Sequence, residues 1–171
     1  MLDWVHGATD VPEAGRPFTR VATATERGAV ATELGLLACR ALEANYSVRP
    51  EAGGRYRVEG RVRAVVEQAC VVTLEPVEAA VDEPFEVTFC PAEAMPAAPS
   101  SEREILSEPE IEPLRDGRIE VGRVVFETLA AALEPYPRRA DAAFEWTDPR
   151  DAGGSEKASP FAVLRSLKRD T

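Results

Sequence analysis

One strand-length segment alternates basic and apolar side chains with a period of two. Residues 55–66 read RYRVEGRVRAVV, and the basic residues fall at odd positions while the apolar residues fall at even positions. Because successive side chains of a strand point to opposite faces, this segment predicts a β-strand with one solvated and one buried face. The residues of the solvated face include the arginines Arg55, Arg57, Arg61 and Arg63. Such alternation is typical of an antiparallel sheet that covers a core on one side.

Further segments complete a predicted antiparallel meander. Strand patterns occur at residues 17–21, 46–48, 69–75 and 85–90, and turn residues at 50–54 join two of the predicted strands into a hairpin. Two segments instead have helical spacing of apolar residues. A capping box at Thr23 and Glu26 begins a helix predicted for residues 24–43, and a second helix is predicted from Val121 to Leu133. The expected fold is α+β, an antiparallel β-meander packed by two amphipathic helices.

The 171 residues suffice for about one domain. We expect a flexible N-terminus at residues 1–16 and a single α+β domain at 17–137. Within that domain, residues 91–116 are rich in proline and acidic residues and predict a mobile acidic loop. A flexible tail is expected at 138–171, with a short basic amphipathic segment at 159–169.

The charge balance limits the classes of partner. Twenty basic residues stand against thirty acidic ones, a net charge of −10. This balance argues against nonspecific coating of DNA, which needs net positive potential, although a local basic surface is still allowed. No apolar stretch of about 18 residues predicts a membrane helix, and the first ten residues lack the features of a secretory signal. A cytoplasmic location without membrane association is therefore expected.

Residues that carry catalysis are scarce. The single histidine, His6, is expected to be an exposed terminal residue, and no nucleotide-binding glycine motif is present. The cysteines Cys39, Cys70 and Cys90 form no C-x-x-C pair, so free buried thiols are predicted. A carboxylate cluster at residues 102–112 lacks the spacing of a calcium loop and predicts a solvated linker. We expect no enzyme, no cofactor and no metal site.

Two features are candidates for binding. The arginines Arg55, Arg57, Arg61 and Arg63 could contact RNA phosphates, since guanidinium groups pair with phosphate in bidentate fashion. The alternative is a solvated sheet face, on which Glu86, Glu75 or Glu43 neutralise the arginines across the strands. The second feature is the C-terminal segment, which either packs on its own domain or binds a partner. Its candidate partner-binding residues are Phe161, Leu164, Arg165, Leu167, Lys168 and Arg169.

The order of several motifs resembles the YceD family of large ribosomal RNA subunit accumulation proteins. The resemblance covers roughly residues 17–137 and 159–169, and two blocks together make it fairly specific. These are Cys70-Val-Val-Thr-Leu-Glu-Pro-Val77 and Asp116-Gly-Arg-Ile-Glu-Val-Gly122; shorter matches are Gly60-Arg-Val-Arg-Ala64, Phe89-Cys-Pro91, Pro135-Tyr-Pro137 and Pro160-Phe-Ala-Val-Leu164. The chain departs from the family at Thr73, where many members have a second cysteine, and at Glu120, where the usual residue is aspartate.

The resemblance implies a non-enzymatic, cytoplasmic bacterial factor that promotes accumulation or processing of 23S-type ribosomal RNA. The implied partners are ribosomal RNA or a pre-large-subunit particle. Our main hypothesis is that the four arginines bind RNA. The alternative is a protein-interaction adaptor, in which the acidic segment 102–116 holds a basic ribosomal protein.

Overall fold

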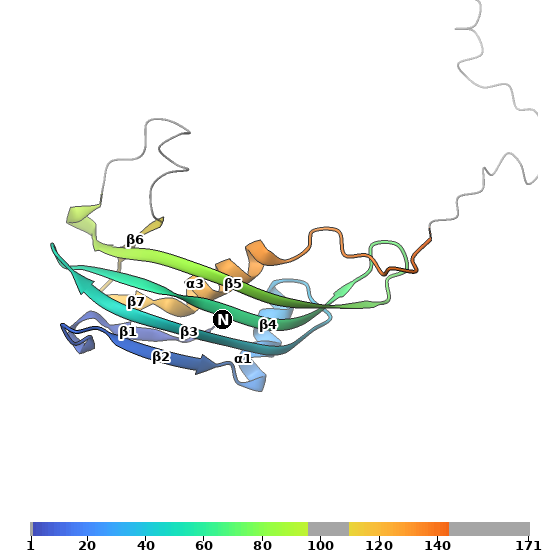
Figure 1. Ribbon diagram of the computed structural model, residues 1–171, viewed down its shortest axis with the longest axis horizontal. Coiled ribbons are helices and arrows are strands. Elements are labelled where there is room, and N and C mark those ends of the chain that lie inside the picture. The colour runs from blue at the N-terminus through green and yellow to red at the C-terminus, as the bar shows by residue number, and fades with distance from the viewer. Residues whose placement is uncertain (1, 96–109, 144–171) are drawn as a thin grey trace, which may run out of the picture. The chain divides into compact units, whose positions relative to one another are not determined.

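The computed structural model describes residues 2–95 and 110–143 (Figure 1). The chain divides into two compact units, residues 1–140 and 141–171, and every helix and strand named below lies in the first unit. The strands are β1 (Val5–Gly7), β2 (Arg16–Val21), β3 (Ala38–Glu51), β4 (Arg55–Ala69), β5 (Pro76–Pro91), β6 (Glu110–Leu114) and β7 (Arg118–Glu120). The helices are α1 (Ala24–Glu33) and α3 (Val121–Ala132), with short 3-10 helices at Ala8–Asp10 and Ala92–Ala94.

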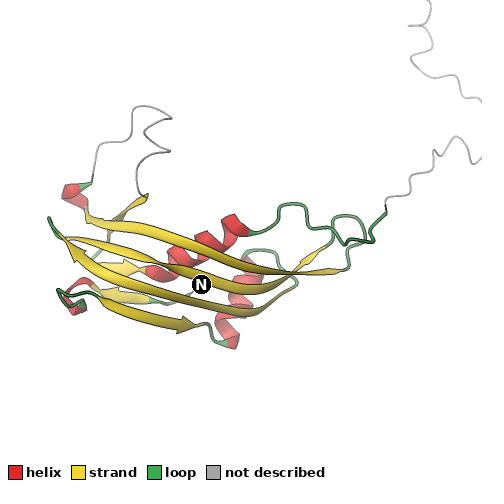
Figure 2. Cartoon of the chain, viewed as in Figure 1, coloured by secondary structure: helices red, strands yellow, loops and turns green. Residues whose placement is uncertain are grey.

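A five-stranded sheet forms the body of this unit, with the strand order β2-β3-β4-β5-β6 (Figure 2). The first four strands are consecutive and antiparallel, as the meander predicted, whereas β6 runs parallel to β5. A separate two-stranded ribbon pairs β1 with β7. The α+β class and the antiparallel meander are thus confirmed.

The core lies on the inner face of the sheet, under the helices. Helix α1 packs against β3, and α3 packs against β4 and β5. The even-numbered residues of β4 turn to this side, as predicted, so that Val58, Val62 and Ala64 are buried. One cluster joins them to Val30 of α1 and Leu129 of α3. Burial of such side chains contributes about 1.5–3 kcal/mol each and holds the helices on the sheet.

Two glycines allow close approach of neighbouring segments. A Cβ atom at Gly60 would collide with the Tyr46 Cβ atom and the Asn45 carbonyl oxygen on β3. A Cβ atom at Gly122 would collide with the backbone carbonyl of Leu2. The Gly122 amide donates to the Trp4 carbonyl oxygen at 2.9 Å, so the start of α3 is fastened to the N-terminal residues.

The helix predicted for residues 24–43 is too long. The capping box at Thr23 and Glu26 is present, but α1 ends at Glu33, and Gly35 adopts a left-handed φ of 64°. Residues 38–51 form β3, whose buried side chains Leu42, Ala44, Tyr46 and Val48 alternate with a period of two. Apolar residues such as Leu37 and Ala41 fit both periods, and pairing with β4 decides for the strand.

The strand predicted for residues 69–75 is also wrong, because Cys70–Thr73 form a turn and the next strand begins at Pro76. The expectation of an irregular N-terminus at residues 1–16 is wrong as well. Residues 5–7 form β1, and the side chains of Leu2 and Trp4 are buried. The Trp4 indole Nε1–H donates to Glu26 Oε1 at 2.9 Å, a contact across 22 residues of sequence that local patterns do not indicate.

The acidic loop predicted for residues 91–116 contains regular structure at both ends. Residues 92–94 form a 3-10 helix, and Glu110–Leu114 form β6, paired with Val87–Pro91. Residues 96–109 and the basic segment 159–169 lie outside the described residues. Among the helices described here, none is long and apolar enough to cross a membrane.

Candidate functional site

The odd-numbered arginines of β4 lie together on the outer face of the sheet, as the alternation predicts. This arginine face consists of Arg55, Arg57, Arg61 and Arg63. Carboxylates lie beside them on β3 and β5, and the register places Arg63 directly between Glu43 and Asp82. The side chains of Arg57, Arg61 and Arg63 remain 43–52% exposed.

Three of the four arginines make ion pairs on this face. Arg57 Nη2 lies 2.8 Å from Glu86 Oε1, and Arg61 Nη1 lies 2.9 Å from Asp82 Oδ1. Arg63 approaches Asp82 at 3.5 Å and Glu43 at 3.7 Å. Hydrogen bonds from Arg61, burial and the nearby arginines act on Asp82, with the net result that its pKa is lowered. The face is therefore a network of exposed pairs, each of which contributes about 0–1 kcal/mol.

The expected neutralisation of these arginines is correct for Glu86 and Glu43. It is wrong for Glu75, which pairs with Arg139 at 3.4 Å, and the sequence pattern missed Asp82. Arg55 makes no ion pair with any residue that the structure describes. It lies at the end of the β3–β4 hairpin, where Arg49 and Arg57 are cross-strand neighbours.

Acidic side chains are concentrated at a groove between β5 and α3. An open pocket of about 630 Å³ lies between β5, the first residue of β6 and α3. We call this pocket the carboxylate groove. Its apolar lining includes Phe85, Val124, Ala131 and Ala132, and its acidic lining is Glu83, Glu86, Glu110 and Glu127.

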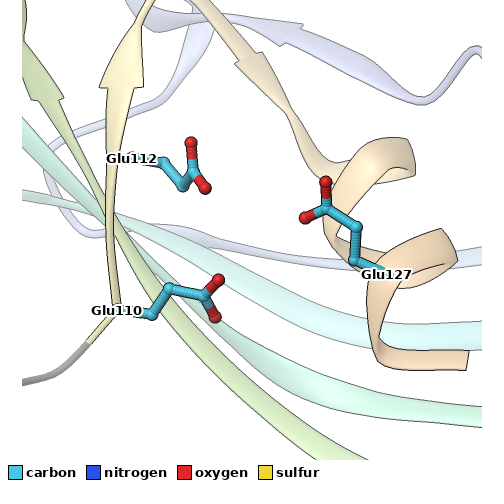
Figure 3. Close-up of side chains that lie close together, drawn as sticks. All are labelled: Glu110, Glu112 and Glu127. Atoms are coloured by element: carbon cyan, nitrogen blue, oxygen red, sulfur yellow. The ribbon is translucent and has the colours of Figure 1, made fainter. Parts of the chain in front are cut away.

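Strand β6 and helix α3 bring three carboxylates together beside this groove. Glu110 and Glu112 are two residues apart on β6, so they lie on the same face of the strand. They point toward Glu127 of α3 (Figure 3), and carboxylate oxygens of the three residues lie within 4.8 Å of one another. Oxygen ligands at this spacing suit a hard cation, but a basic side chain of the protein already lies among them.

That side chain is Arg123. Its Nη2 lies 2.6 Å from Glu112 Oε2, and its Nη1 lies 3.2 Å from Glu112 Oε1 and 3.0 Å from Glu127 Oε1. The Arg123 and Glu112 side chains are only 26% and 19% exposed, so solvent screens this pair less than the pairs of the arginine face. The hydrogen bonds that Arg123 donates to Glu112, against some desolvation, raise the pKa of Arg123.

Glu110 differs from its two neighbours because Arg123 makes no hydrogen bond to it among the described contacts. Burial, followed by repulsion from Glu112 and Glu127, raises the pKa of Glu110 above its usual value. The groove thus presents an excess of negative charge next to an apolar floor. Such a surface favours a cationic side chain whose aliphatic stem packs on the floor while its charged end reaches the carboxylates.

Several of these residues were not candidates from the sequence. Glu110 and Glu112 belong to the carboxylate cluster interpreted as a solvated linker and to the acidic segment 102–116 of the adaptor alternative, whereas Arg123, Glu127 and Glu83 were not singled out. The spacing of Arg123 and Glu127 at i and i+4 is a signal for a helix-surface pair, which the sequence does contain. Their meeting with β6 depends on the parallel pairing of β5 and β6, which no local pattern indicates.

The predicted tail residues lie outside the described residues, so Phe161, Leu164, Arg165, Leu167, Lys168 and Arg169 stay a prediction.

His6 was expected to be exposed, and this is wrong. The His6 ring lies 4.1 Å from the Phe18 ring, and its Nε2 lies 2.8 Å from the Tyr46 hydroxyl oxygen. Desolvation lowers the pKa of His6, and the nearby arginines act in the same direction.

The free, buried state of Cys39, Cys70 and Cys90 is confirmed. Cys70 begins the turn that connects β4 and β5, and the Thr73 amide donates to its sulfur at 3.5 Å. Hydrogen bonds from Thr73, and further ones from backbone amides, lower the pKa of Cys70 to about 6. Thr73 thus holds the cysteine of its own turn instead of supplying a second thiol.

A protein-family model matches residues 58–168 of the chain, and its description is "Large ribosomal RNA subunit accumulation protein YceD". This range covers most of β4, all of β5 and every element of the carboxylate groove. No curated protein and no solved structure matches the chain.

Proposed function

The chain belongs to the YceD family, whose name connects it with accumulation of large-subunit ribosomal RNA, and from this we propose that it acts as a non-enzymatic binding factor in the cytoplasm. In this role it holds a basic ribosomal protein at the carboxylate groove during assembly of the large subunit. The adaptor hypothesis is thereby preferred to direct RNA binding through the arginine face.

The observation that supports this choice is the different pairing of the two charged surfaces. Arg57, Arg61 and Arg63 already have carboxylate partners, which an RNA phosphate would have to displace. Beside the groove, by contrast, Glu110, Glu112 and Glu127 converge around a single guanidinium, that of Arg123, within the described part of the chain, and Glu83 adds another carboxylate to the groove lining. Ribosomal proteins that bind RNA carry excess positive charge, and an acidic surface can pair with their basic side chains before RNA does.

Direct RNA contact remains a second candidate because of the hairpin end. Arg55 is exposed and has no ionic partner in the described structure, and Arg49 and Arg57 lie close to it. This is a smaller basic surface than the four arginines suggested. A contact of this size would be weak, and its salt dependence would be shallow because few phosphates are contacted.

The test measures binding of the full chain to individual purified large-subunit proteins and, in parallel, to 23S-type RNA fragments. The groove variant is Glu83→Gln/Glu110→Gln/Glu127→Gln. Its matched control is Glu13→Gln/Glu33→Gln/Glu51→Gln, which removes the same charge from exposed positions away from the groove. We expect affinity for a basic protein to fall about tenfold or more in the groove variant, equivalent to ~1.4 kcal/mol, and little change in the control.

Equal losses in the two variants would contradict a specific groove and indicate general charge attraction. Tight binding to RNA alone would contradict the adaptor role. In that case Arg55→Gln/Arg57→Gln/Arg61→Gln/Arg63→Gln should abolish RNA binding and flatten its salt dependence.

A further inference from the structure

The outer edge of β5 is only partly paired. Strand β6 pairs with β5 at Val87–Pro91, the last part of a strand that begins at Pro76. Along residues 76–86, β4 lies on one side, and on the other side the described residues supply no strand (Figures 1 and 2). Backbone C=O groups and the N–H groups of the non-proline residues on this edge therefore have no strand partner among the described residues, while Pro76 and Pro84 carry no N–H.

The same edge borders the carboxylate groove. Glu83, Pro84, Phe85 and Glu86 of the unpaired part line the pocket together with Glu110, the first residue of β6. A strand added beside residues 76–86 would thus continue the line of β6. Its side chains would alternate between the outer face of the sheet and the groove under α3.

The charge along this edge selects the kind of strand that can bind. Residues 76–86 read PVEAAVDEPFE and carry four acidic residues with no basic residue. Asp82 and Glu86 pair with arginines of β4, whereas Glu78 and Glu83 make no direct ion pair among the described residues. Glu110 and Glu127 add two carboxylates from β6 and α3. Two copies of such an edge repel each other, as does the acidic run at 102–108 that precedes β6 in sequence. A lysine- or arginine-rich strand has the complementary charge.

We propose that an extended basic segment of a partner protein adds to the sheet as a strand beside Pro76–Glu86 of β5, with its cationic side chains on the surrounding carboxylates. This inference rests on the proposed function and specifies how the partner is held. Main-chain hydrogen bonds to the β5 edge provide affinity that does not depend on sequence, and the acidic side chains select for positive charge.

The probe is a blocked ten-residue peptide of alternating lysine and valine, which spans about 33 Å when extended and so matches the free edge. A first analogue of this peptide has the same sequence, but the backbone nitrogens of alternate residues, those along one edge of the extended peptide, are methylated. A second analogue is methylated along the other edge. Methylation removes N–H donors but leaves the charge unchanged, so it separates main-chain pairing from electrostatic attraction.

We expect the unmodified peptide to bind the full chain and one of the two methylated peptides to bind about tenfold or more weakly, as expected for loss of two or more hydrogen bonds. Hydrogen exchange of backbone amides in 76–86 should slow when the unmodified peptide is added. Equal binding of all three peptides would overturn strand addition while leaving a charge-based adaptor role intact.

Failure of every peptide, together with failure of the basic ribosomal proteins, would overturn both proposals. A variant lacking residues 97–108 tests a different occupant of the edge. If this variant binds the peptide and the full chain does not, the chain's own acidic segment covers the edge, and the proposed partner site is wrong.

Discussion

The arginine face and the carboxylate groove are both rich in charge, but they differ in how that charge is balanced. On the arginine face, carboxylates of β3 and β5 stand opposite the arginines of β4, and three ion pairs at 2.8–3.5 Å result. Beside the groove, Arg123 pairs with Glu112 and Glu127 and also attracts Glu110, while Glu110 and Glu83 make no direct ion pair among the described residues. The extent of ion pairing within the protein, more than the number of charged residues, distinguishes the arginine face from the groove that we propose as a binding surface.

The two regions also differ in the structural role of their ion pairs. Arg123 and Glu112 are about three-quarters or more buried, and they connect α3 to β6. The pairs of the arginine face connect neighbouring strands that backbone hydrogen bonds already hold together. Loss of a pair should therefore affect stability strongly in the groove and weakly on the face.

The largest effect is expected for Arg123→Gln. This change leaves Glu112 and Glu127 close together without their guanidinium, and we expect the free energy of unfolding to fall by about 2 kcal/mol, less than for a fully buried pair. Urea unfolding of the wild type and the variant measures this difference. Arg123→Lys, which keeps the charge but not the bidentate geometry, should retain part of the stability. A loss no greater than that of an exposed arginine would contradict the distinction.

Glu110→Gln is expected to have a smaller effect of opposite sign. The raised pKa of Glu110 means that the folded state binds its proton more readily than the unfolded state, so ionisation of Glu110 at pH 7 costs stability. The variant should be more stable than the wild type at pH 7, and this advantage should disappear as the pH falls below the usual glutamate value. A series of urea midpoints from pH 7 to pH 4 measures it. A constant difference over this range would show that burial and repulsion from Glu112 and Glu127 do not raise the pKa of Glu110.

The smallest effect is expected for Arg61→Gln on the arginine face. Its pair with Asp82 is about half-exposed and screened by solvent, so the loss should be small and well below that of Arg123→Gln. The difference from the wild type should shrink further in 0.5 M salt, because the Debye length there falls to about 4 Å. Urea unfolding at low and high salt provides the measurement. A loss as large as that of Arg123→Gln would remove the contrast between the two regions.

Local patterns in the sequence determined much of the secondary structure. The alternation in residues 55–66 predicted both faces of β4 correctly, because a strand's side-chain period allows only two assignments and the arginines exclude one. The spacing from Val121 to Leu129 likewise predicted α3. Residues 34–43 were misassigned because helix and strand patterns overlap over so short a stretch, and only pairing of β3 with β4 resolves them.

The groove could be predicted only in part. Its acidic residues 110 and 112 were visible as charge, but their position was not. Glu112 lies 11 residues from Arg123, with β7 and a turn between them, and Glu83 is contributed by a third element. Because β5 and β6 pair in parallel, they are not joined by a short hairpin, and the spacing of residues in the sequence does not indicate that Glu83, Glu112 and Arg123 lie near one another.

The sequence by itself thus determined the α+β class, the solvated and buried faces of β4, the N-cap of α1 and the family of the chain, since each depends on neighbouring residues or on a linear motif. The tertiary structure alone decided that Asp82 pairs with Arg61 and that Glu110, Glu112 and Glu127 converge on Arg123. The physical reason is that charge interactions act through space over a few ångströms, and the packing of β5, β6 and α3 sets which charges come within that range.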